Sequence, residues 1–402
     1  MHRRMNDWRT SRWAGRLILL VALGVLTGCL PASDTPTPAL PAKQVLAPGY
    51  LGMYDVSYQQ LDLAAQAGLN TVSTSPMSVE ETLQYVRTAA ALGLKVRAAL
   101  PTSLLGASEE EVIAYVAAFA NQPAVVLWYL PEEPETPSQH REWKQLYDRV
   151  TAGDPARRPV AVYLAGGASV SYFEQWADIC DVFMAGAYPE FYRIPRAALF
   201  SRVKNASIAA GRRNMTVLAT PQFFDLATIR EATPSLTLPA DPPTYPGHPS
   251  PVQTRADAYA ALVAGAQGLD WYTFEWGVLV PDLWAGVRQT ITELNALAPV
   301  FRESTAQPAV SARVLSGPAK VSSFPFMTEA SIQARAWQHA SGLYIVAVNL
   351  ADEIVRARID GFSPGGTKAV VLFEDRNLSL ENGGLEDDFA PNEAHVYWIA
   401  RQ

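Results

Sequence analysis

The feature that most constrains the fold is an alternation between short apolar runs and amphipathic stretches, from Gly49 to about Phe301. Such an alternation is typical of strand–helix units that build a parallel sheet. Eight apolar runs can be counted, over Tyr50–Asp55, Asn70–Ser75, Lys95–Pro101, Val125–Leu130, Pro159–Ala165, Asp181–Tyr188, Met215–Phe223 and Gly268–Glu275. Each run is predicted to be a buried strand.

Helices are predicted between the strands because apolar residues recur there three and four positions apart. They cover Val79–Leu92, Glu109–Ala120, Glu142–Val150, Tyr172–Ala177, Ala197–Ala210 and Arg255–Ala266. Eight such units in about 250 residues match the size of a (β/α)₈ barrel, the TIM barrel. The alternative is a doubly wound open sheet. That fold usually carries a glycine-rich phosphate-binding turn after its first strand, and the turn after Asp55 has none.

The pattern changes after a predicted helix over Leu283–Ala298. From about Val310 to Arg401, short alternating runs separated by glycines replace the helical periodicity, and they cover Ile332–Gln338, Leu343–Asn349, Val355–Ile359, Ala369–Leu372 and Ala394–Ile399. This pattern indicates an all-β module, most simply a sandwich. The predicted fold is therefore an α/β chain with a (β/α)₈ barrel over residues 48–305, followed by a small all-β sandwich domain over residues 306–402.

The N-terminus has the features of an export signal: a basic start, an apolar segment over Leu17–Leu26, and Cys29 directly after that segment. Leu26-Thr27-Gly28-Cys29 resembles the bacterial lipobox, which implies cleavage before Cys29 and lipidation of that residue. We therefore expect a lipoprotein signal peptide over residues 1–29, a Pro/Ala/Thr-rich tether over residues 30–47, and an exported protein anchored by lipid to a bacterial membrane at the cell envelope. An ordinary signal peptide or an uncleaved anchor is the alternative.

Composition narrows the possible ligands. The formal charge of −7 and the lack of a basic block beyond the N-terminus argue against nucleic-acid binding. Histidines are few, and none of those after the signal segment pairs at metal-ligand spacing, so neither a metal nor another cofactor is predicted. No Gly-x-Ser-x-Gly motif is present, which argues against a serine hydrolase of that type.

Acidic and aromatic residues gather at the predicted C-terminal ends of the strands, which form the active face of a barrel. They are Tyr54, Asp55, Glu132, Glu133, Tyr188, Glu190, Gln222, Phe224, Glu275 and Trp276. Two carboxylates across a cleft lined with aromatic rings are what glycoside hydrolysis requires. Two alternatives remain: rings inside strands, such as Trp128 and Tyr272, belong to the core, and Glu132, Glu133 and Glu135 form the acidic first turn of the following helix.

Leu130-Pro131-Glu132-Glu133-Pro134, at the end of the fourth strand, resembles the Asn-Glu-Pro signature of clan A glycoside hydrolases. The resemblance implies that Glu133 is the acid/base residue and that Glu132 takes the place of the asparagine. Trp276 and Tyr188 correspond to aromatic residues at the ends of the eighth and sixth strands of that clan. A small C-terminal β-domain is also similar to those that follow many such barrels.

The chain departs from this clan at the seventh strand, where Gln222 stands instead of the nucleophilic glutamate. Glu275, after the eighth strand, is the best substitute as second catalytic carboxylate. Opposite strands favour the wider separation of an inverting pair, about 6.5–9.5 Å. The alternative, if the strands are numbered differently, is that Glu275 is the nucleophile of a retaining enzyme. The substrate-binding candidates are Asp55, Glu132, Tyr188, Glu190, Gln222 and Trp276, with Asp55 and Glu190 also held in reserve as carboxylates.

A long proline-rich connection runs between Phe224 and about Thr254, and it is predicted to be a flap over the barrel mouth or a solvent-side insertion. The leading prediction for the whole chain is a glycoside hydrolase with a carbohydrate substrate. A catalytically inactive carbohydrate-binding barrel is the alternative. A transporter's solute receptor is disfavoured, since such receptors have two similar α/β lobes.

Overall fold

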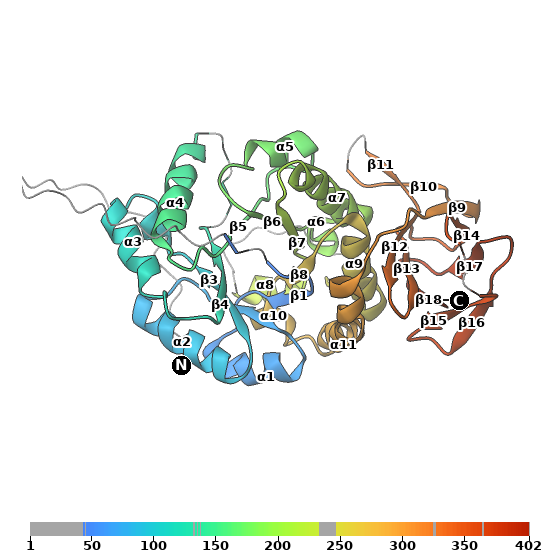
Figure 1. Ribbon diagram of the computed structural model, residues 1–402, viewed down its shortest axis with the longest axis horizontal. Coiled ribbons are helices and arrows are strands. Elements are labelled where there is room, and N and C mark those ends of the chain that lie inside the picture. The colour runs from blue at the N-terminus through green and yellow to red at the C-terminus, as the bar shows by residue number, and fades with distance from the viewer. Residues whose placement is uncertain are drawn as a thin grey trace, which may run out of the picture. The chain divides into compact units, whose positions relative to one another are not determined.

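The computed structural model describes residues 43–44, 46–131, 133–134, 136, 138–232, 247–324, 327–363 and 366–401. Residues from Pro41 to Gln402 form one compact unit, which contains the parallel sheet, its helices and the C-terminal strands (Figure 1). Cys29 and the rest of the predicted signal and tether up to residue 42 lie outside the described residues. Among the described helices, none is long and apolar enough to cross a membrane.

Eight parallel strands form the predicted barrel. They are β1 (Tyr50–Met53), β2 (Thr71–Ser73), β3 (Lys95–Ala99), β4 (Val125–Tyr129), β5 (Val160–Tyr163), β6 (Val182–Ala185), β7 (Thr216–Ala219) and β8 (Gly268–Trp271). Their order is β1-β8-β7-β6-β5-β4-β3-β2, all parallel. Asn70 joins the two ends of this sheet: its backbone N–H donates to the carbonyl of Leu51 at 3.1 Å, and its Oδ1 accepts from the backbone N–H of Leu51 at 3.0 Å. The predicted (β/α)₈ architecture is thereby confirmed.

Helices surround the strands, and every predicted helix is present. In the described residues the helices are η1 (Tyr58–Gln60), α1 (Leu61–Gln66), α2 (Val79–Ala91), η2 (Thr102–Leu104), α3 (Glu109–Ala117), α4 (His140–Gly153), α5 (Val170–Gln175), α6 (Pro189–Tyr192), α7 (Ala197–Gly211), α8 (Leu226–Ala232), α9 (Pro251–Ala264), α10 (Phe274–Gly277) and α11 (Pro281–Glu303). Capping boxes open α2, α3 and α9 at Ser78, Ser108 and Ser250, where each serine accepts a hydrogen bond from the third backbone N–H of its helix.

The barrel has two apolar layers. The larger one fills the space between the strands and the surrounding helices, as it does around Val86, Val116 and Phe183. The smaller one fills the interior of the barrel, from Leu46 at the N-terminal end of the strands to Tyr188 and Phe224 at the C-terminal end. The interior is therefore packed with side chains, and any pocket there lies at an end of the barrel.

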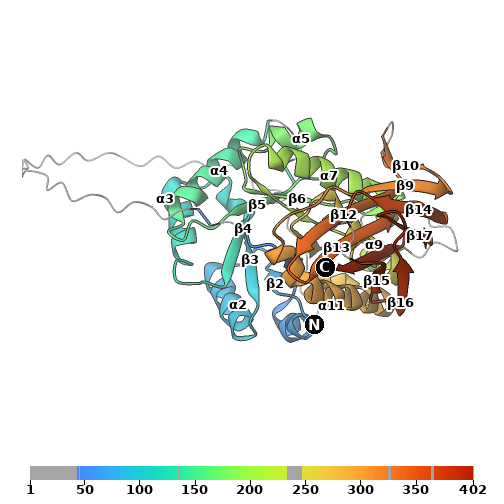
Figure 2. The same cartoon turned by 45° about the vertical axis from the view of Figure 1, so that its right-hand side comes forward.

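The C-terminal region contains antiparallel strands, as predicted. They are β9 (Ser311–Ser316), β10 (Lys320–Ser322), β11 (Thr328–Ala330), β12 (Ile332–His339), β13 (Gly342–Asn349), β14 (Val355–Asp360), β15 (Lys368–Leu372), β16 (Arg376–Ser379), β17 (Leu385–Phe389) and β18 (Ala394–Ala400). A five-stranded sheet, β12-β13-β18-β15-β16, and a three-stranded sheet, β17-β14-β9, enclose a core of their own that includes Ile345, Ala357 and Tyr397 (Figure 2). The all-β sandwich is thereby confirmed.

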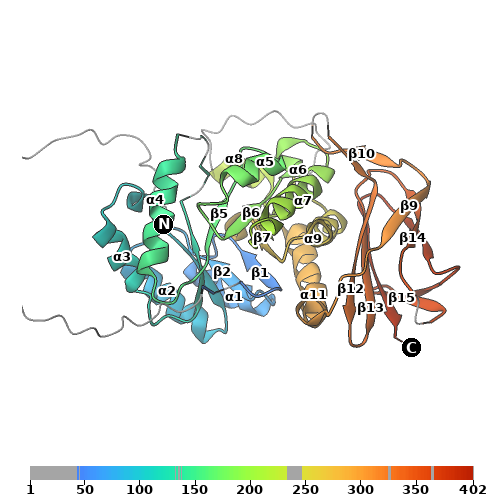
Figure 3. The ribbon, with the colours of Figure 1, turned by 45° about the horizontal axis from the view of Figure 1, so that its top comes forward.

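The sandwich packs on the barrel through α9 and α11, which lie beside β12 and β13 (Figure 3). Arg255 of α9 links the two regions, because its guanidinium hydrogen-bonds the carbonyl of Ala394 in β18 and its Nε pairs with Glu293 of α11 at 2.7 Å. The two regions belong to one compact unit. The domain boundary between residues 305 and 306 stays a prediction.

Two local predictions need correction. The connection after Phe224 is not free of secondary structure, because α8 forms at Leu226 and α9 already begins at Pro251, where Ser250 caps the helix. Residues 233–246 of the predicted flap lie outside the described residues. The eighth strand ends at Trp271 rather than at Glu275, since Phe274–Gly277 forms the short helix α10.

Candidate active site

A pocket of about 220 Å³ opens at the C-terminal end of the barrel strands, and we call it the aromatic pocket. It is lined by Tyr54, Glu133, Tyr163, Tyr188, Phe191, Tyr192, Phe224, Ile229, Tyr272 and Trp276. These residues follow or end strands β1, β4, β5, β6, β7 and β8, or lie on the short helices α6, α8 and α10. The aromatic pocket thus occupies the position at which barrels of this kind assemble their reactive groups.

Tyr188 is the centre of the ring cluster. Its ring is nearly parallel to those of Tyr163, Tyr192 and Tyr272, at centroid distances of 6.5, 6.1 and 5.8 Å. Phe224 meets Tyr188 edge-on at 5.2 Å. Burial raises the pKa of Tyr188 well above its usual range, so its hydroxyl stays protonated at neutral pH. The wall of the pocket therefore offers both ring faces and neutral hydroxyl groups to a ligand.

A buried cation fixes the floor of the aromatic pocket. The guanidinium of Arg97, on β3, lies between the rings of Tyr54 and Tyr129, at 3.8 and 4.1 Å from their centroids. Its Nε pairs with Oδ2 of Asp270 at 2.8 Å, and the hydroxyl of Tyr50 donates to the same oxygen at 2.9 Å. Because both charged groups are buried and paired, this arrangement holds Tyr54 in a fixed position beneath the pocket.

Glu133 is the one carboxylate that lines the aromatic pocket among the described residues. Its backbone has a φ of +56°, a left-handed conformation that is uncommon for residues other than glycine, asparagine and aspartate. Burial raises the pKa of Tyr192, and the nearby charge of Glu133 raises it further. Glu133 therefore leaves β4 in a turn and acts electrostatically on the rings of the pocket. Glu132, its predicted neighbour at the site, lies outside the described residues.

Glu275 and Asp55 line a second cavity of about 400 Å³, which we call the acidic pocket. Ser75 and Thr273 donate to the two carboxylate oxygens of Asp55, each at 3.1 Å. Burial raises the pKa of Glu275, and the charge of Asp55 raises it further. Asp55 also has a left-handed φ, of +50°. The structure thus groups Glu275 with Asp55 rather than with Glu133.

The two pockets adjoin at the mouth of the barrel. After β1, Tyr54 lines the aromatic pocket and its neighbour Asp55 lines the acidic pocket. After β8, Trp276 lines the aromatic pocket and its neighbour Glu275 lines the acidic pocket. The predicted pair of carboxylates therefore lies in two neighbouring cavities instead of facing a single one.

Gln222 and Glu190 line neither pocket and are held by the protein itself. Gln222 is buried: its Oε1 accepts from the backbone N–H of Phe191 at 3.3 Å, and its Nε2 donates to the carbonyls of Phe224 at 3.1 Å and Gly247 at 3.4 Å. Glu190 pairs with Arg196, which also pairs with Asp257 at 2.6 Å. In the structure both residues fix the segments that carry the aromatic rings.

Four residues that line the aromatic pocket were not predicted from the sequence. Tyr163 ends β5 and could have been found by the rule that selected the other strand ends. Phe191, Tyr192 and Ile229 lie on α6 and α8, which are too short to show a helical period. Within the described residues, no group of three or more His, Cys, Asp or Glu side chains is arranged to hold a metal ion.

Comparisons with known proteins bear on the fold. No family model matches the sequence, and no curated protein matches it. The structure is similar to an α-amylase from Geobacillus thermoleovorans solved with acarbose, with a TM-score of 0.54, 8% identity, and coverage of 88% of this chain and 99% of that one. It is also similar to AmyP in complex with maltose, with a TM-score of 0.53, 10% identity, and coverage of 88% and 93%.

A maltogenic α-amylase, AmyB from Thermotoga neapolitana, gives a TM-score of 0.52 at 10% identity, with coverage of 87% of this chain and 99% of that one. At such identities the similarity concerns the fold. The match extends over almost the whole of each solved chain. This protein therefore shares with these glycoside hydrolases the arrangement of an eight-stranded parallel barrel and a C-terminal β-domain.

Proposed function

We propose that the chain is a glycoside hydrolase that acts on a carbohydrate at the mouth of the barrel. The observation that carries this proposal is the position of Glu133, a carboxylate at the end of β4 in a pocket otherwise lined by aromatic rings and one isoleucine. Aromatic faces bind sugar rings by stacking, and a carboxyl group beside them is suited to protonate a glycosidic oxygen.

In this proposal Glu133 is the general acid and Glu275 is the second carboxylate, which activates water. The raised pKa of Glu275 makes it a stronger base once it is ionised. A saccharide would reach both residues by crossing the rim where the aromatic and acidic pockets adjoin. Because β4 and β8 are opposite strands of the eight-stranded barrel, we propose the wider carboxylate pair of an inverting enzyme.

The neighbours in fold support a carbohydrate as the substrate. One of them was solved with acarbose and another with maltose. The rings of the aromatic pocket also favour an uncharged, ring-shaped ligand. Starch-type α-glucans are therefore the first substrates to assay.

A second candidate function is carbohydrate binding without hydrolysis. Gln222 favours this function, because the amide of Gln222 hydrogen-bonds backbone groups and no carboxylate stands at this position after β7. A barrel with a single carboxylate in its sugar pocket has the means to bind but lacks the second group that hydrolysis requires.

Assays of the chain from Pro41, which is one compact unit, separate the two functions. We expect hydrolysis of at least one member of a panel of α-glucans, β-glucans and aryl glycosides, and a loss of about a hundredfold or more in Glu133→Gln and in Glu275→Gln. Glu174→Gln is the matched control, because Glu174 lies on α5, pairs with Arg212 and lines neither pocket. Saturable sugar binding without turnover would favour the binding protein, and full activity of Glu275→Gln would remove that residue from the mechanism.

We also propose that Cys29 anchors the exported protein to a bacterial membrane. Lys43 pairs with Asp181 at 2.5 Å, and the backbone N–H of Gln44 donates to the carbonyl of Arg157 at 2.9 Å. Asp181 precedes β6 and Arg157 precedes β5, so the chain enters the barrel at the end opposite the aromatic pocket. An anchor there would leave the mouth accessible. Loss of the protein from the membrane fraction in Cys29→Ser tests this, and unchanged fractionation contradicts it.

A further inference from the structure

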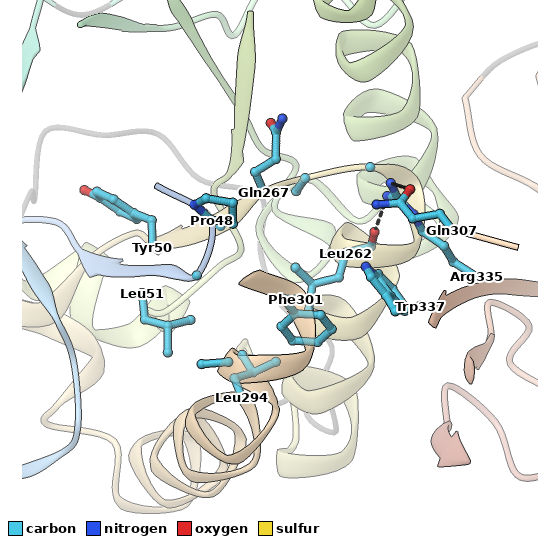
Figure 4. A pocket seen from close by; sticks show the side chains of 15 residues that line it. Pro48, Tyr50, Leu51, Leu262, Gln267, Leu294, Phe301, Gln307, Arg335 and Trp337 are labelled. Atoms are coloured by element: carbon cyan, nitrogen blue, oxygen red, sulfur yellow. Dashed lines mark hydrogen bonds between the residues drawn. The ribbon is translucent and has the colours of Figure 1, made fainter. Parts of the chain in front are cut away.

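A separate cavity of about 260 Å³ lies at the N-terminal end of the barrel strands, and we call it the base cavity. It is lined by residues at the start of β1 and β8, by α9 and α11, and by β12 of the sandwich. Figure 4 shows the side chains of Leu262, Leu294, Phe301, Arg335 and Trp337 around a common space. The base cavity shares no lining residue with the aromatic or acidic pocket.

Arg335 is the charged group of the base cavity. A guanidinium has five N–H groups. Two of those on Arg335 are used: Nη1 donates to the carbonyl of Leu262 at 2.9 Å and Nη2 to Oε1 of Gln307 at 2.6 Å (Figure 4). Both acceptors are neutral. The guanidinium also lies 5.4 Å from the ring centroid of Trp337. These contacts fix the orientation of the side chain without neutralising its charge.

No carboxylate of the described residues forms an ion pair with Arg335. Several buried or half-buried arginines of the barrel, such as Arg97, Arg196 and Arg255, do pair with an aspartate or glutamate. The pKa of Arg335 is lowered, and burial is the cause, since no negative charge opposes the effect. A half-buried cation of this kind gains more from an incoming anion than an exposed one does, because the surrounding protein screens charges less than water.

The rest of the wall is mostly apolar. Leu51, Leu262, Leu294, Ala298 and Phe301 face the cavity from β1, α9 and α11. At the packing density of protein interiors, the cavity has room for about 200 Å³ of atoms, the size of a carboxylic acid with about eight to ten carbons. One guanidinium suits one planar carboxylate, which it can bind through two N–H groups.

We propose that the base cavity is a binding site for an amphipathic monocarboxylate of medium chain length. Its carboxylate pairs with Arg335, and its aliphatic tail lies against Leu262, Leu294 and Phe301. This site is independent of the proposed glycosidase, because no group at the mouth of the barrel takes part in it.

Calorimetric titration of octanoate into the chain from Pro41 tests the proposal. We expect one saturable site with a Kd below about 1 mM, and at least about tenfold weaker binding of 1-octanol, which has the same tail but no charge. Arg335→Gln should weaken octanoate binding at least about tenfold and bring it to the level of octanol. Arg313→Gln, an exposed arginine of the same domain, is the matched control and should leave the Kd unchanged.

A second variant guards against loss of folding in Arg335→Gln. Ala298→Met places extra atoms in the cavity while Arg335 stays in place, and it should abolish octanoate binding with the thermal unfolding midpoint kept. Nuclear Overhauser effects between the methylenes of octanoate and the indole protons of Trp337 should locate the ligand in the base cavity. The Trp337 signals are identified by their absence in Trp337→Phe. No saturation by octanoate, equal affinity for octanol, or unchanged binding by Arg335→Gln and Ala298→Met would each overturn the proposal.

Discussion

The hydrogen bonds of Gln222 show why a glutamine, and not a glutamate, suits the position after β7. The amide supplies a donor and an acceptor at once, and it joins three backbone segments: Phe191 in α6, Phe224 after β7, and Gly247 before α9. A glutamate has no donor for the carbonyls of Phe224 and Gly247 at neutral pH. The residue thus serves the shape of the pocket, and a carboxylate there would face two carbonyl oxygens.

Gln222→Glu is therefore expected to destabilise the protein and not to create a better enzyme. Loss of two donated hydrogen bonds at a buried site costs about 2 kcal/mol or more. Urea unfolding measures the change, with Gln59→Glu as an exposed control that should stay within about 0.5 kcal/mol of the wild type. Equal stability of the two variants would show that the amide of Gln222 does not hold the loops together.

The residue scale also sets the limit of what the sequence could predict about the site. Glu133, Tyr188 and Trp276 were predicted from their position at strand ends, and all three line the aromatic pocket. The separation of Glu275 from Glu133 could not be predicted, because consecutive residues of one strand end face different pockets. Which of two neighbours faces which pocket depends on turns such as the left-handed one at Asp55.

At the scale of elements, periodicity predicted the barrel well because each strand is buried on both faces and each helix on one. The ends of β6, β7 and β8 were placed three or four residues too far along the chain. Apolar residues continue past these strands, as Tyr188 and Phe274 do, because they pack at the mouth of the barrel instead of in the sheet. Apolar composition alone does not distinguish these two environments.

Strands of the sandwich were missed where their residues are polar and exposed. In β9, four of the six residues are exposed, and its apolar side chains, such as Val314, are only half-buried. In β10 and β11 one side chain in three turns inward, with Glu329 as the buried residue of β11. Pairing with neighbouring strands, which the local sequence does not encode, holds these segments in place.

The hairpin of β10 and β11 docks on α7 through Glu329. Its Oε1 accepts from Oγ of Ser201 at 2.7 Å, and its two oxygens lie 2.5 and 2.6 Å from Nζ of Lys204. Glu329→Ala leaves the buried hydroxyl of Ser201 without its acceptor. We expect the free energy of unfolding to fall by about 2 kcal/mol. Relative to the wild type, amide hydrogen exchange should accelerate more in β10 and β11 than in β13.

Glu386→Ala is the control for this hairpin. Glu386 is about one-third exposed and makes only long contacts, to Arg356 at 3.3 Å and to Arg358 at 3.4 Å, so its loss should cost at most about 1 kcal/mol. Exchange rates in β10 and β11 that do not differ between Glu329→Ala and the wild type would show that the hairpin is held by other contacts.

The stability of the whole molecule depends on pH through a charge cluster around the buried His395 in the sandwich. His395 contacts Glu374 at 2.6 Å and Glu393 at 3.3 Å, one carboxylate on each ring nitrogen. Burial alone lowers the pKa of His395, but hydrogen bonds to the two glutamates raise it to about 9. The cluster also contains Arg376, which pairs with Glu374 and Asp387. The imidazole is therefore charged in the folded protein at neutral pH.

The sign of the effect follows from that pKa. Since the pKa of the folded state lies above the unfolded value of about 6.5, protonation stabilises the fold at and below pH 6.5, and this contribution is lost as the pH rises through 9. The difference in unfolding free energy between wild type and His395→Asn should shrink by about 3 kcal/mol from pH 6 to pH 10. An equal difference at both pH values would contradict this pH dependence.

The architecture gives the protein two ends with different properties. The mouth has the aromatic pocket with Glu133, and the base has an apolar cavity with Arg335. Of these two cavities, only the mouth is lined by a carboxylate among the described residues. We therefore propose Glu133 as the group that donates a proton to the leaving group of a glycoside.

The most direct test compares aryl glycosides whose leaving groups differ in acidity, with wild type and Glu133→Ala. Loss of a general acid should lower kcat/KM by a factor of about 10² to 10⁴ for a poorly departing phenol, and far less for a dinitrophenol, which leaves without protonation. An equal loss on both substrates, or none on either, would contradict the role of Glu133.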